Sequence, residues 1–168
     1  MKLRVKFNKK NYLKYISHLD LIRLFQRSFN RAQIPVKYSE GFNPQPRFSI
    51  AHPLSLGIES CEEYMDIELE EKIDPLDFME RINQILPKDI QILDCIYPKD
   101  KRPIAAIISL AHYEISFGLV EDMDEVKGQI DRWLEKEKII ITRIRKRRGR
   151  QIKREQNIRP LIKKLAFT

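Results

Sequence analysis

The sequence predicts an α+β protein built as two lobes. Apolar and charged residues alternate in several short segments, and two segments of helical periodicity follow good N-cap residues. A charged stretch flanked by prolines, Pro98 to Pro103, then interrupts the pattern. The elements before this stretch run strand, helix, strand pair, helix, strand, which matches a ferredoxin-like βαββαβ unit. We therefore expect a ferredoxin-like lobe over residues 1–98 and a second, smaller α+β lobe over residues 99–168.

The chain is predicted to open with a strand and a helix. Apolar residues alternate with basic ones between residues 2 and 7, which is the period of a half-buried strand. Ser17, with Asp20 three residues on, approximates a capping box and predicts a helix that ends at Pro35. The residues of this helix expected to face the core are Leu21 or Ile22, Phe25, Phe29 and Ala32.

The middle of the first lobe is predicted as two strands separated by irregular chain. The first strand runs from Val36 to Ser39, and the segment Gly41 to Pro46 follows as a loop because one glycine and two prolines break any ladder. Residues 48–58 are expected to be extended or irregular. Apolar and acidic residues then alternate from Met65 to Glu70, which predicts the second strand.

A helix and a strand are expected to complete the first lobe. Asp74 and Pro75 are typical of an N-cap and a first helical position, and the helix stops before Pro87. A strand follows from Ile90 to Tyr97. The residues of this helix expected on its core face are Leu76, Met79, Ile82 and Ile85 or Leu86.

The second lobe resembles the first one begun again but cut short. Ile104 to Leu110 is predicted as either a short helix or the start of a strand, and both alternatives stay open. Helical spacing predicts a third helix through Met123, Val126, Ile130 and Trp133 or Leu134. The remaining expected elements are a strand from Tyr113 to Leu119 with Tyr113, Ile115 and Phe117 on one face, strands at Lys138 to Ile144 and about 150–158 joined by a turn at Gly149, and a helix from Pro160 to Leu165.

Composition predicts a cytoplasmic globular protein without a membrane partner. Hydrophobic residues make up 42% of the chain, and no apolar run approaches the roughly 18 residues of a membrane span. The N-terminus alternates instead of forming the apolar block of a signal peptide. The only cysteines are Cys61 and Cys95, and two separate thiols supply neither an expected disulfide nor a zinc or iron–sulfur ligand set. No metal and no cofactor is therefore predicted.

Positive charge is concentrated near the C-terminus. Residues 138–168 hold twelve Lys/Arg against the single acid Glu155, a net charge of +11, whereas residues 1–137 hold 20 basic and 23 acidic residues, a net charge of −3. This asymmetry predicts a polyanionic partner, with a solvated tail as the alternative. RNA, as tRNA or rRNA, is the expected partner. The densest part of the cluster comprises Arg143, Arg145, Lys146, Arg147, Arg148, Arg150, Lys153 and Arg154.

That cluster predicts contacts with a phosphate backbone. Each neutralised phosphate releases counterions, and arginine, which outnumbers lysine here by six to two, also stacks on bases. If the segment is a hairpin around Gly149, it projects as a charged finger with cations on both faces. The cluster strongly predicts a polyanionic partner, but it hardly indicates which polyanion that is.

A second basic feature lies on the first predicted helix. Arg23, Arg27 and Arg31 are spaced at i, i+4 and i+8 and form one stripe, with Arg47 and Lys37 expected nearby. A solvated helix face is the competing explanation. The basic residues of the first strand are expected to pair with the acidic residues of the third, so that face of the sheet is neutralised. RNA contact is therefore assigned to the helix and the finger, not to the first sheet.

No catalytic centre is predicted. His18 and His52 are the histidines considered for general acid–base work, but His18 lies beside a helix cap and His52 precedes a proline in a loop. The chain also lacks a glycine-rich phosphate loop and the CxxxCxxC cluster that binds a radical SAM iron–sulfur centre. An RNA-cleaving ferredoxin-like enzyme that uses one of these histidines stays open as an alternative.

Linked motifs in the first 70 residues resemble a known family. They are Tyr15-Ile16-Ser17-His18-Leu19-Asp20-Leu21, Arg31-Ala32 with Ile34-Pro35, Tyr38-Ser39-Glu40-Gly41-Phe42-Asn43-Pro44, Pro53-Leu54-Ser55-Leu56-Gly57-Ile58 and Glu63-Tyr64. Together they resemble the radical-SAM-linked family, a bacterial domain of unknown function. Members occur as separate chains or fused to the C-terminus of B12-binding-type radical SAM proteins.

The resemblance implies a radical SAM protein as partner, and the substrates of such enzymes include tRNA and ribosomal components. Family members often run past the equivalent of Thr168, which leaves truncation of the second lobe open, and Asn157 stands where an acidic residue is expected. A protein–protein adaptor without direct RNA contact is a further alternative function. The residues that match the family motif and are candidates for a shared surface are Ser17, His18, Asp20, Gly41, Phe42, Asn43 and Pro44.

Overall fold

The first strand of the chain lies in the middle of a four-stranded antiparallel sheet. In the computed structural model, β1 (Lys2–Lys9) pairs with β3 (Ser60–Glu68) on one side and with β4 (Ile92–Ile96) on the other, while β2 (Phe48–Ile50) pairs with β3. The strand order is β2-β3-β1-β4. The alternation predicted for the first strand is confirmed, because every second residue of β1 is buried.

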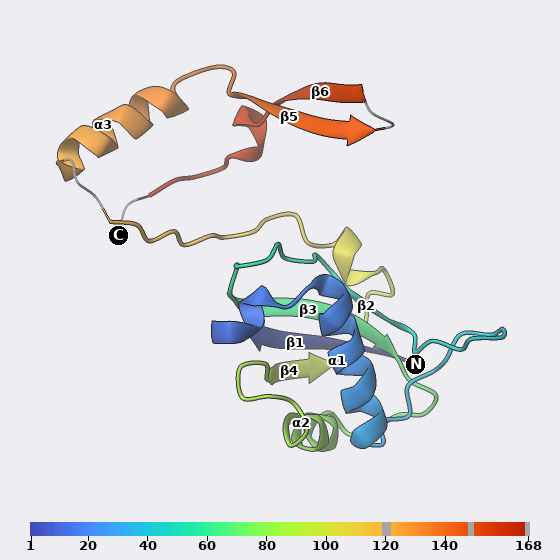
Figure 1. Ribbon diagram of the computed structural model, residues 1–168. Coiled ribbons are helices and arrows are strands. Elements are labelled where there is room, and N and C mark those ends of the chain that lie inside the picture. The colour runs from blue at the N-terminus through green and yellow to red at the C-terminus, as the bar shows by residue number, and fades with distance from the viewer. Residues whose placement is uncertain (119–121, 148–149, 167–168) are drawn as a thin grey trace. The chain divides into compact units, whose positions relative to one another are not determined.

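The structure describes residues 1–118, 122–147 and 150–166, and its contacts divide the chain into unit 1, Met1–His112, and unit 2, Tyr113–Thr168 (Figure 1). Residues 99–112, which we expected in the second lobe, are grouped with unit 1. Ile104 is buried there, and its N–H donates a hydrogen bond to Asp66 of β3 at 2.9 Å. Short 3-10 helices occur at Asn11–Tyr15, Ile104–Ala106 and Arg159–Leu161.

Helix α1 (His18–Arg31) begins where the sequence predicted. The Ser17 hydroxyl accepts a hydrogen bond from the Asp20 N–H at 3.1 Å and caps the helix. The helix ends before Pro35, because Gln33 adopts a left-handed φ of 51° that no α-helix continues. The helix therefore ends before the chain reaches Pro35, and the proline is not what terminates it.

Phenylalanine rings form the centre of the core between α1 and the sheet. Phe25 of α1 lies 5.0 Å from Phe7 of β1 and 5.9 Å from Phe29, measured between ring centroids. Phe29 in turn lies 5.3 Å from Phe48 of β2. Truncating one such buried ring to alanine typically costs about 3–5 kcal/mol, so this cluster accounts for much of the stability of unit 1.

Helix α2 (Pro75–Asn83) starts as predicted, but its buried face differs. Asp74 caps the helix by accepting hydrogen bonds from the N–H groups of residues 76 and 77. Leu76, expected in the core, is 75% exposed. Phe78, which was not expected there, is fully buried, whereas Ile82 and Leu86 are buried as predicted. The larger aromatic ring at position 78 takes the inward position, which rotates the apolar stripe.

The strand predicted from Val36 to Ser39 is wrong. Only isolated bridges form there, between Val36 and Leu69 and between Tyr38 and Pro46. The edge strand that pairs with β3 is β2, which lies in the stretch that we expected to be extended or irregular. Two backbone hydrogen bonds flank the second bridge, from the Ser39 N–H to the Gln45 carbonyl at 2.8 Å and from the Arg47 N–H to the Lys37 carbonyl at 2.7 Å, and the bridge does not extend into a ladder.

One face of the sheet carries paired charges, as predicted. The register places Arg4 opposite Asp66, and the guanidinium Nε lies 2.8 Å from the carboxylate. Lys2 lies 3.8 Å from the same carboxylate, and Lys6 pairs with Glu62 at 3.4 Å. This face therefore offers a balanced charge, not a basic platform.

Unit 2 consists of a helix and a two-stranded hairpin. Helix α3 (Met123–Leu134), capped by Asp122, matches the predicted third helix. Strands β5 (Ile140–Arg147) and β6 (Arg150–Asn157) pair along their whole length. The Asn157 side chain closes the base of the hairpin by accepting hydrogen bonds from the N–H groups of residues 139 and 159. The predicted turn at Gly149 lies outside the described residues.

Two predictions for unit 2 are wrong. Residues 113–118 form no strand, and Tyr113, Ile115 and Phe117 are 54%, 76% and 62% exposed. Alternation alone does not make a strand, and no described segment pairs with this one. The helix expected from Pro160 to Leu165 is limited to a 3-10 turn, Arg159–Leu161, followed by extended backbone.

No helix among residues 1–118, 122–147 and 150–166 is long and apolar enough to cross a membrane. Cys61 is exposed and Cys95 is buried, and both thiols are free. Burial raises the pKa of the Cys95 thiol to about 11, and this thiol donates to the carbonyl of Pro75 at 3.2 Å. Cys95 is therefore a packing residue that links β4 to α2.

Candidate nucleic-acid interface

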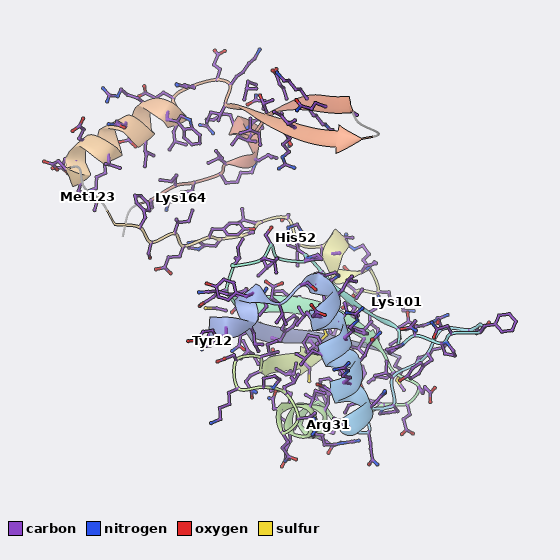
Figure 2. All side chains as sticks on the ribbon, viewed as in Figure 1. Tyr12, Arg31, His52, Lys101, Met123 and Lys164 are labelled. Atoms are coloured by element: carbon purple, nitrogen blue, oxygen red, sulfur yellow. The ribbon has the colours of Figure 1, made fainter. Side chains whose placement is uncertain are left out.

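The three arginines predicted as a stripe on α1 are all exposed. Arg23 pairs with Asp20 at 3.1 Å, so its charge is partly neutralised. Arg27 and Arg31 form no ion pair with any residue that the structure describes. Figure 2 shows Arg31 at the C-terminal end of the helix. The stripe thus presents two guanidinium groups that no described carboxylate neutralises.

Arg47 belongs to a different neighbourhood. Its guanidinium lies 3.4 Å from Glu68 of β3, and its N–H donates to the carbonyl of Lys37 at 2.7 Å. Arg47 and Lys37 therefore lie next to each other, whereas no contact places either of them beside the arginine stripe of α1, where both were expected. The contacts of Arg47 tie it to the sheet edge, and none of them joins it to the arginines of α1.

The family-motif loop between α1 and β2 is anchored at its base and exposed at its centre. Ser39 and Gln45 bond to each other twice, through the N–H of Ser39 at 2.8 Å and the N–H of Gln45 at 2.9 Å. The Gln45 side chain also accepts a hydrogen bond from Gln26 of α1 at 3.1 Å. Gly41 adopts a φ of 124°, which favours glycine, and Phe42 is fully exposed, at 112%. The loop extends away from the rest of unit 1 in Figure 1.

Three of the remaining motif residues have a clear structural role. The Ser17 hydroxyl donates to the Asp20 carboxylate at 2.6 Å and accepts from the Asp20 N–H. These bonds, together with Arg23, lower the pKa of the Asp20 carboxyl. Asn43 accepts a hydrogen bond from Gln45 at 3.1 Å, and Pro44 is an exposed loop residue. Helix capping and loop closure therefore account for Ser17, Asp20 and Asn43.

The register of the β5–β6 hairpin sorts its cations into two rows. In an antiparallel pair, residues directly opposite belong to the same face, and faces alternate along each strand. Arg143 pairs with Arg154, position 145 with Ile152, and position 147 with position 150. These pairs form one row, which we call the arginine row; its basic members are Arg143, Arg145, Arg147, Arg150 and Arg154. Both lysines, Lys146 and Lys153, fall in the other row, with Glu155.

Like charges stand directly opposite each other in the arginine row. Arg143 and Arg154 are both exposed and are cross-strand partners. Such a pair destabilises a ribbon, and the row contains no acid to offset it. Arg148 lies outside the described residues. The backbone register therefore assigns the exposed Arg143 and Arg154 to the same face of the hairpin.

Comparison with known proteins gives one match over nearly the whole chain. A family model described as "Uncharacterized protein conserved in bacteria (DUF2344)" matches residues 2–168. The chain belongs to this family. Searches of curated proteins and of solved structures find no match. The description places this family in bacteria and states no activity for its members.

A small pocket of this DUF2344 protein brings titratable residues together that the sequence kept apart. His18 and Ser17 from the start of α1, Lys9 from β1 and Glu63 from β3 line it. Its volume is about 10 Å³, room for a single water molecule. No nucleobase fits such a space, so the pocket does not support the RNA-cleaving alternative. Among the described residues, no cluster of three or more metal-ligating side chains forms.

Lys9 and Glu63 each affect the pKa of the other. Burial lowers the pKa of the Lys9 ammonium, and the nearby Glu63 carboxylate partly restores it. Burial raises the pKa of Glu63, against the opposing effects of Ser60, Lys9 and His52. His52 thus lies within electrostatic reach of this carboxylate, although its own position is in an exposed loop (Figure 2).

The sequence analysis missed Lys9 and Glu63. The signal for Lys9 was present: it continues the inward-facing positions Leu3, Val5 and Phe7, and it is only 3% exposed. A lysine at an apolar position of an alternating strand indicates a buried ammonium. Glu63 carried no comparable signal, because its approach to Lys9 depends on the β1–β3 register.

Proposed function

We propose that this DUF2344 protein binds single-stranded RNA in the bacterial cytoplasm, chiefly through the arginine row of the hairpin. The observation that carries the proposal is the direct opposition of Arg143 and Arg154 in a row with no acid. An isolated ribbon is destabilised by such a pair, whereas a phosphate backbone relieves the repulsion and releases counterions. Arginine adds bidentate phosphate contacts and stacking on bases.

Unit 1 contributes a second contact surface in this proposal. Arg27 and Arg31 supply charge that no described residue neutralises, and Phe42 supplies a fully exposed ring on an anchored loop. Proteins that hold single strands without strict sequence preference combine these two elements, cations for the backbone and aromatic rings for the bases. The balanced charge on the face of the first sheet argues against contact there.

We further propose that unit 1 is ferredoxin-like and that the protein serves a radical SAM enzyme. The strand order β2-β3-β1-β4, with a helix after β1 and another after β3, supports the fold assignment. The partner assignment rests on the motif resemblance described above. In this role the chain would present tRNA or rRNA, while the partner carries out the chemistry.

Fluorescence anisotropy of a labelled single-stranded RNA tests the proposal directly. The full chain is titrated at several salt concentrations, with single-stranded DNA and duplex RNA of equal length as comparisons. We expect a linear fall of log affinity with log salt and the tightest binding to single-stranded RNA. Equal affinity for heparin and RNA would reduce the finding to non-specific polyanion binding. Absence of binding at low salt would contradict the proposal and favour the adaptor function.

Replacing Phe42 by alanine is expected to weaken RNA binding while leaving its salt dependence unchanged. Stacking of one base on an aromatic ring contributes about 1–3 kcal/mol, so affinity should fall roughly fivefold to 150-fold at every salt concentration. No charge is removed, so the slope of log affinity against log salt stays constant. Leu56→Ala, at another exposed apolar residue of a loop in unit 1, is the matched control. An equal loss in both variants would exclude stacking on Phe42.

A further inference from the structure

A hollow at the end of the unit 1 sheet gathers lysines from three separate segments. It lies where β1 begins and β4 ends and has a volume of about 470 Å³, within the usual size of small-molecule sites. Lys2 comes from β1, Lys72 from the turn after β3 and Lys101 from the chain after β4. Figure 2 marks Lys101 on this part of unit 1. The remaining lining residues are Met1, Tyr97 and Pro98.

An aromatic ring held in place forms one wall. The Tyr97 hydroxyl accepts a hydrogen bond from the N–H of Ile73 at 3.0 Å and donates to the carbonyl of the same residue at 3.0 Å. These two bonds fix the ring, and the Lys72 ammonium lies 5.6 Å from its centroid. The wall is therefore preorganised, with the Lys72 ammonium over the ring.

The acids near the hollow are either engaged elsewhere or outside it. Asp66, 3.8 Å from Lys2, already accepts hydrogen bonds from Arg4 at 2.8 Å and from the N–H of Ile104 at 2.9 Å. Asp100 pairs with Arg102 at 2.7 Å, and bonds from this arginine lower the pKa of its carboxyl to about 2. Glu70 and Glu71 precede Lys72 in sequence, but neither lines the hollow.

The three lysines of the hollow still have ammonium hydrogens that can donate to a ligand. The Lys2 ammonium donates to the carbonyl of Lys101 at 2.9 Å, which leaves two of its three hydrogens for a ligand. Lys72 and Lys101 form no ion pair with any residue that the structure describes. Lys2 has the Asp66 carboxylate at 3.8 Å, whereas an anion in the hollow would supply the ammonium groups of Lys72 and Lys101 with a counter-charge.

We propose that this hollow binds a nucleoside 5′-phosphate, with the phosphate held by the lysines and the base against Tyr97. Lysine binds phosphate as a point charge, and an aromatic ring stacks on any base. A free mononucleotide and the 5′-phosphorylated end of an RNA share this chemistry. The site lies wholly in unit 1 and does not depend on the function proposed for the hairpin.

Amide NMR of the full, ¹⁵N-labelled chain tests the site, with Ile73 as reporter because its N–H bonds the Tyr97 hydroxyl. Titration with AMP is expected to shift the Ile73 signal to saturation, more tightly than inorganic phosphate and far more tightly than adenosine. The double variant Lys72→Ala, Lys101→Ala should weaken AMP binding about tenfold or more, since two charge-assisted hydrogen bonds are lost. The control, Lys10→Ala with Lys88→Ala, removes the same charge at exposed positions outside the hollow.

Four outcomes would overturn the proposal: no shift at millimolar AMP, equal weakening in both double variants, phosphate binding as tight as AMP, or binding of adenosine alone as tight as AMP. A 5′-phosphorylated tetranucleotide that binds more tightly than both AMP and its unphosphorylated form would assign the site to RNA ends. AMP binding at least as tight as the tetranucleotide would assign it to the free nucleotide. The reporter signals belong to unit 1, so failure here leaves the hairpin proposal intact, and the reverse also holds.

Discussion

Replacing Arg143, Arg145, Arg150 and Arg154 by alanine is expected to flatten the salt dependence of RNA binding by about 3 units of slope. Each phosphate contact with a single strand contributes about −0.7 to the slope of log affinity against log salt, and four contacts are removed. Affinity should fall most at low salt and by a similar factor for RNAs of different sequence, because phosphate contacts carry no base information. Anisotropy titrations between low and moderate salt measure both effects.

The control for this prediction removes the same charge from the same unit. Lys136, Lys138, Lys163 and Lys164 are exposed residues of unit 2 outside the hairpin, and their replacement by alanine also lowers the net charge by four. A much smaller change of slope is expected in this variant. If both variants flatten the slope equally, net charge alone governs binding and the arginine row is not the contact surface. Circular dichroism melts show whether each variant is folded.

Replacing Asp66 by alanine is expected to destabilise unit 1 by about 3–5 kcal/mol, the usual cost of removing one partner of a buried ion pair. Asp66 is 6% exposed and accepts hydrogen bonds from Arg4 at 2.8 Å and 3.2 Å and from the Ile104 N–H at 2.9 Å. Without the carboxylate, a largely buried guanidinium and a buried N–H lose their partner. Urea unfolding, followed by the amide signals of β1, measures the change in unit 1 alone.

A neighbouring residue of the same strand provides the comparison. Glu68 pairs with Arg47 at 3.4 Å, but both side chains are more than 40% exposed. Its replacement by alanine should cost less than about 1 kcal/mol, as exposed pairs usually do. Similar losses for Asp66→Ala and Glu68→Ala would show that the Asp66 network is solvated and adds little. Asp66→Asn, which keeps one acceptor, is expected to lie between the two.

Elements with a local signal were predictable from the sequence. Ser17 and Asp74 are cap residues whose hydrogen bonds involve only the next few N–H groups, so both helix starts were found. The apolar face of α1 was predictable because Phe25 and Phe29 are large and four residues apart. The alternation of β1 was equally clear, since it depends on one strand and its burial.

Elements that depend on a distant partner were not predictable. Alternation at residues 113–118 resembles that of β1, yet only β1 meets neighbours that accept its backbone hydrogen bonds. The short β2 was missed because pairing with β3, not its own three residues, makes it a strand. Leu76 and Phe78 are both apolar, and only packing against the sheet decides which is buried.

The same distinction applies to the candidate sites. The basic cluster near the C-terminus is visible in the sequence, but its separation into an arginine row and a lysine row depends on the β5–β6 register. The hollow of unit 1 joins residues 2, 72, 97 and 101, which no sequence spacing connects. The hollow is apparent only in the folded chain, where the Tyr97 hydroxyl forms hydrogen bonds with the backbone of Ile73.

The opposition of Arg143 and Arg154 makes dissolved ions act on the hairpin in two contrary ways. In the proposed function, salt would compete with RNA for the guanidinium groups and would promote release of the RNA. The same ions screen the repulsion between the two strands, so the unoccupied hairpin gains cohesion as ionic strength rises. Under that proposal, RNA and dissolved ions would both act as counterions for the same cross-strand arginine pair, so either one would reduce the repulsion between the strands.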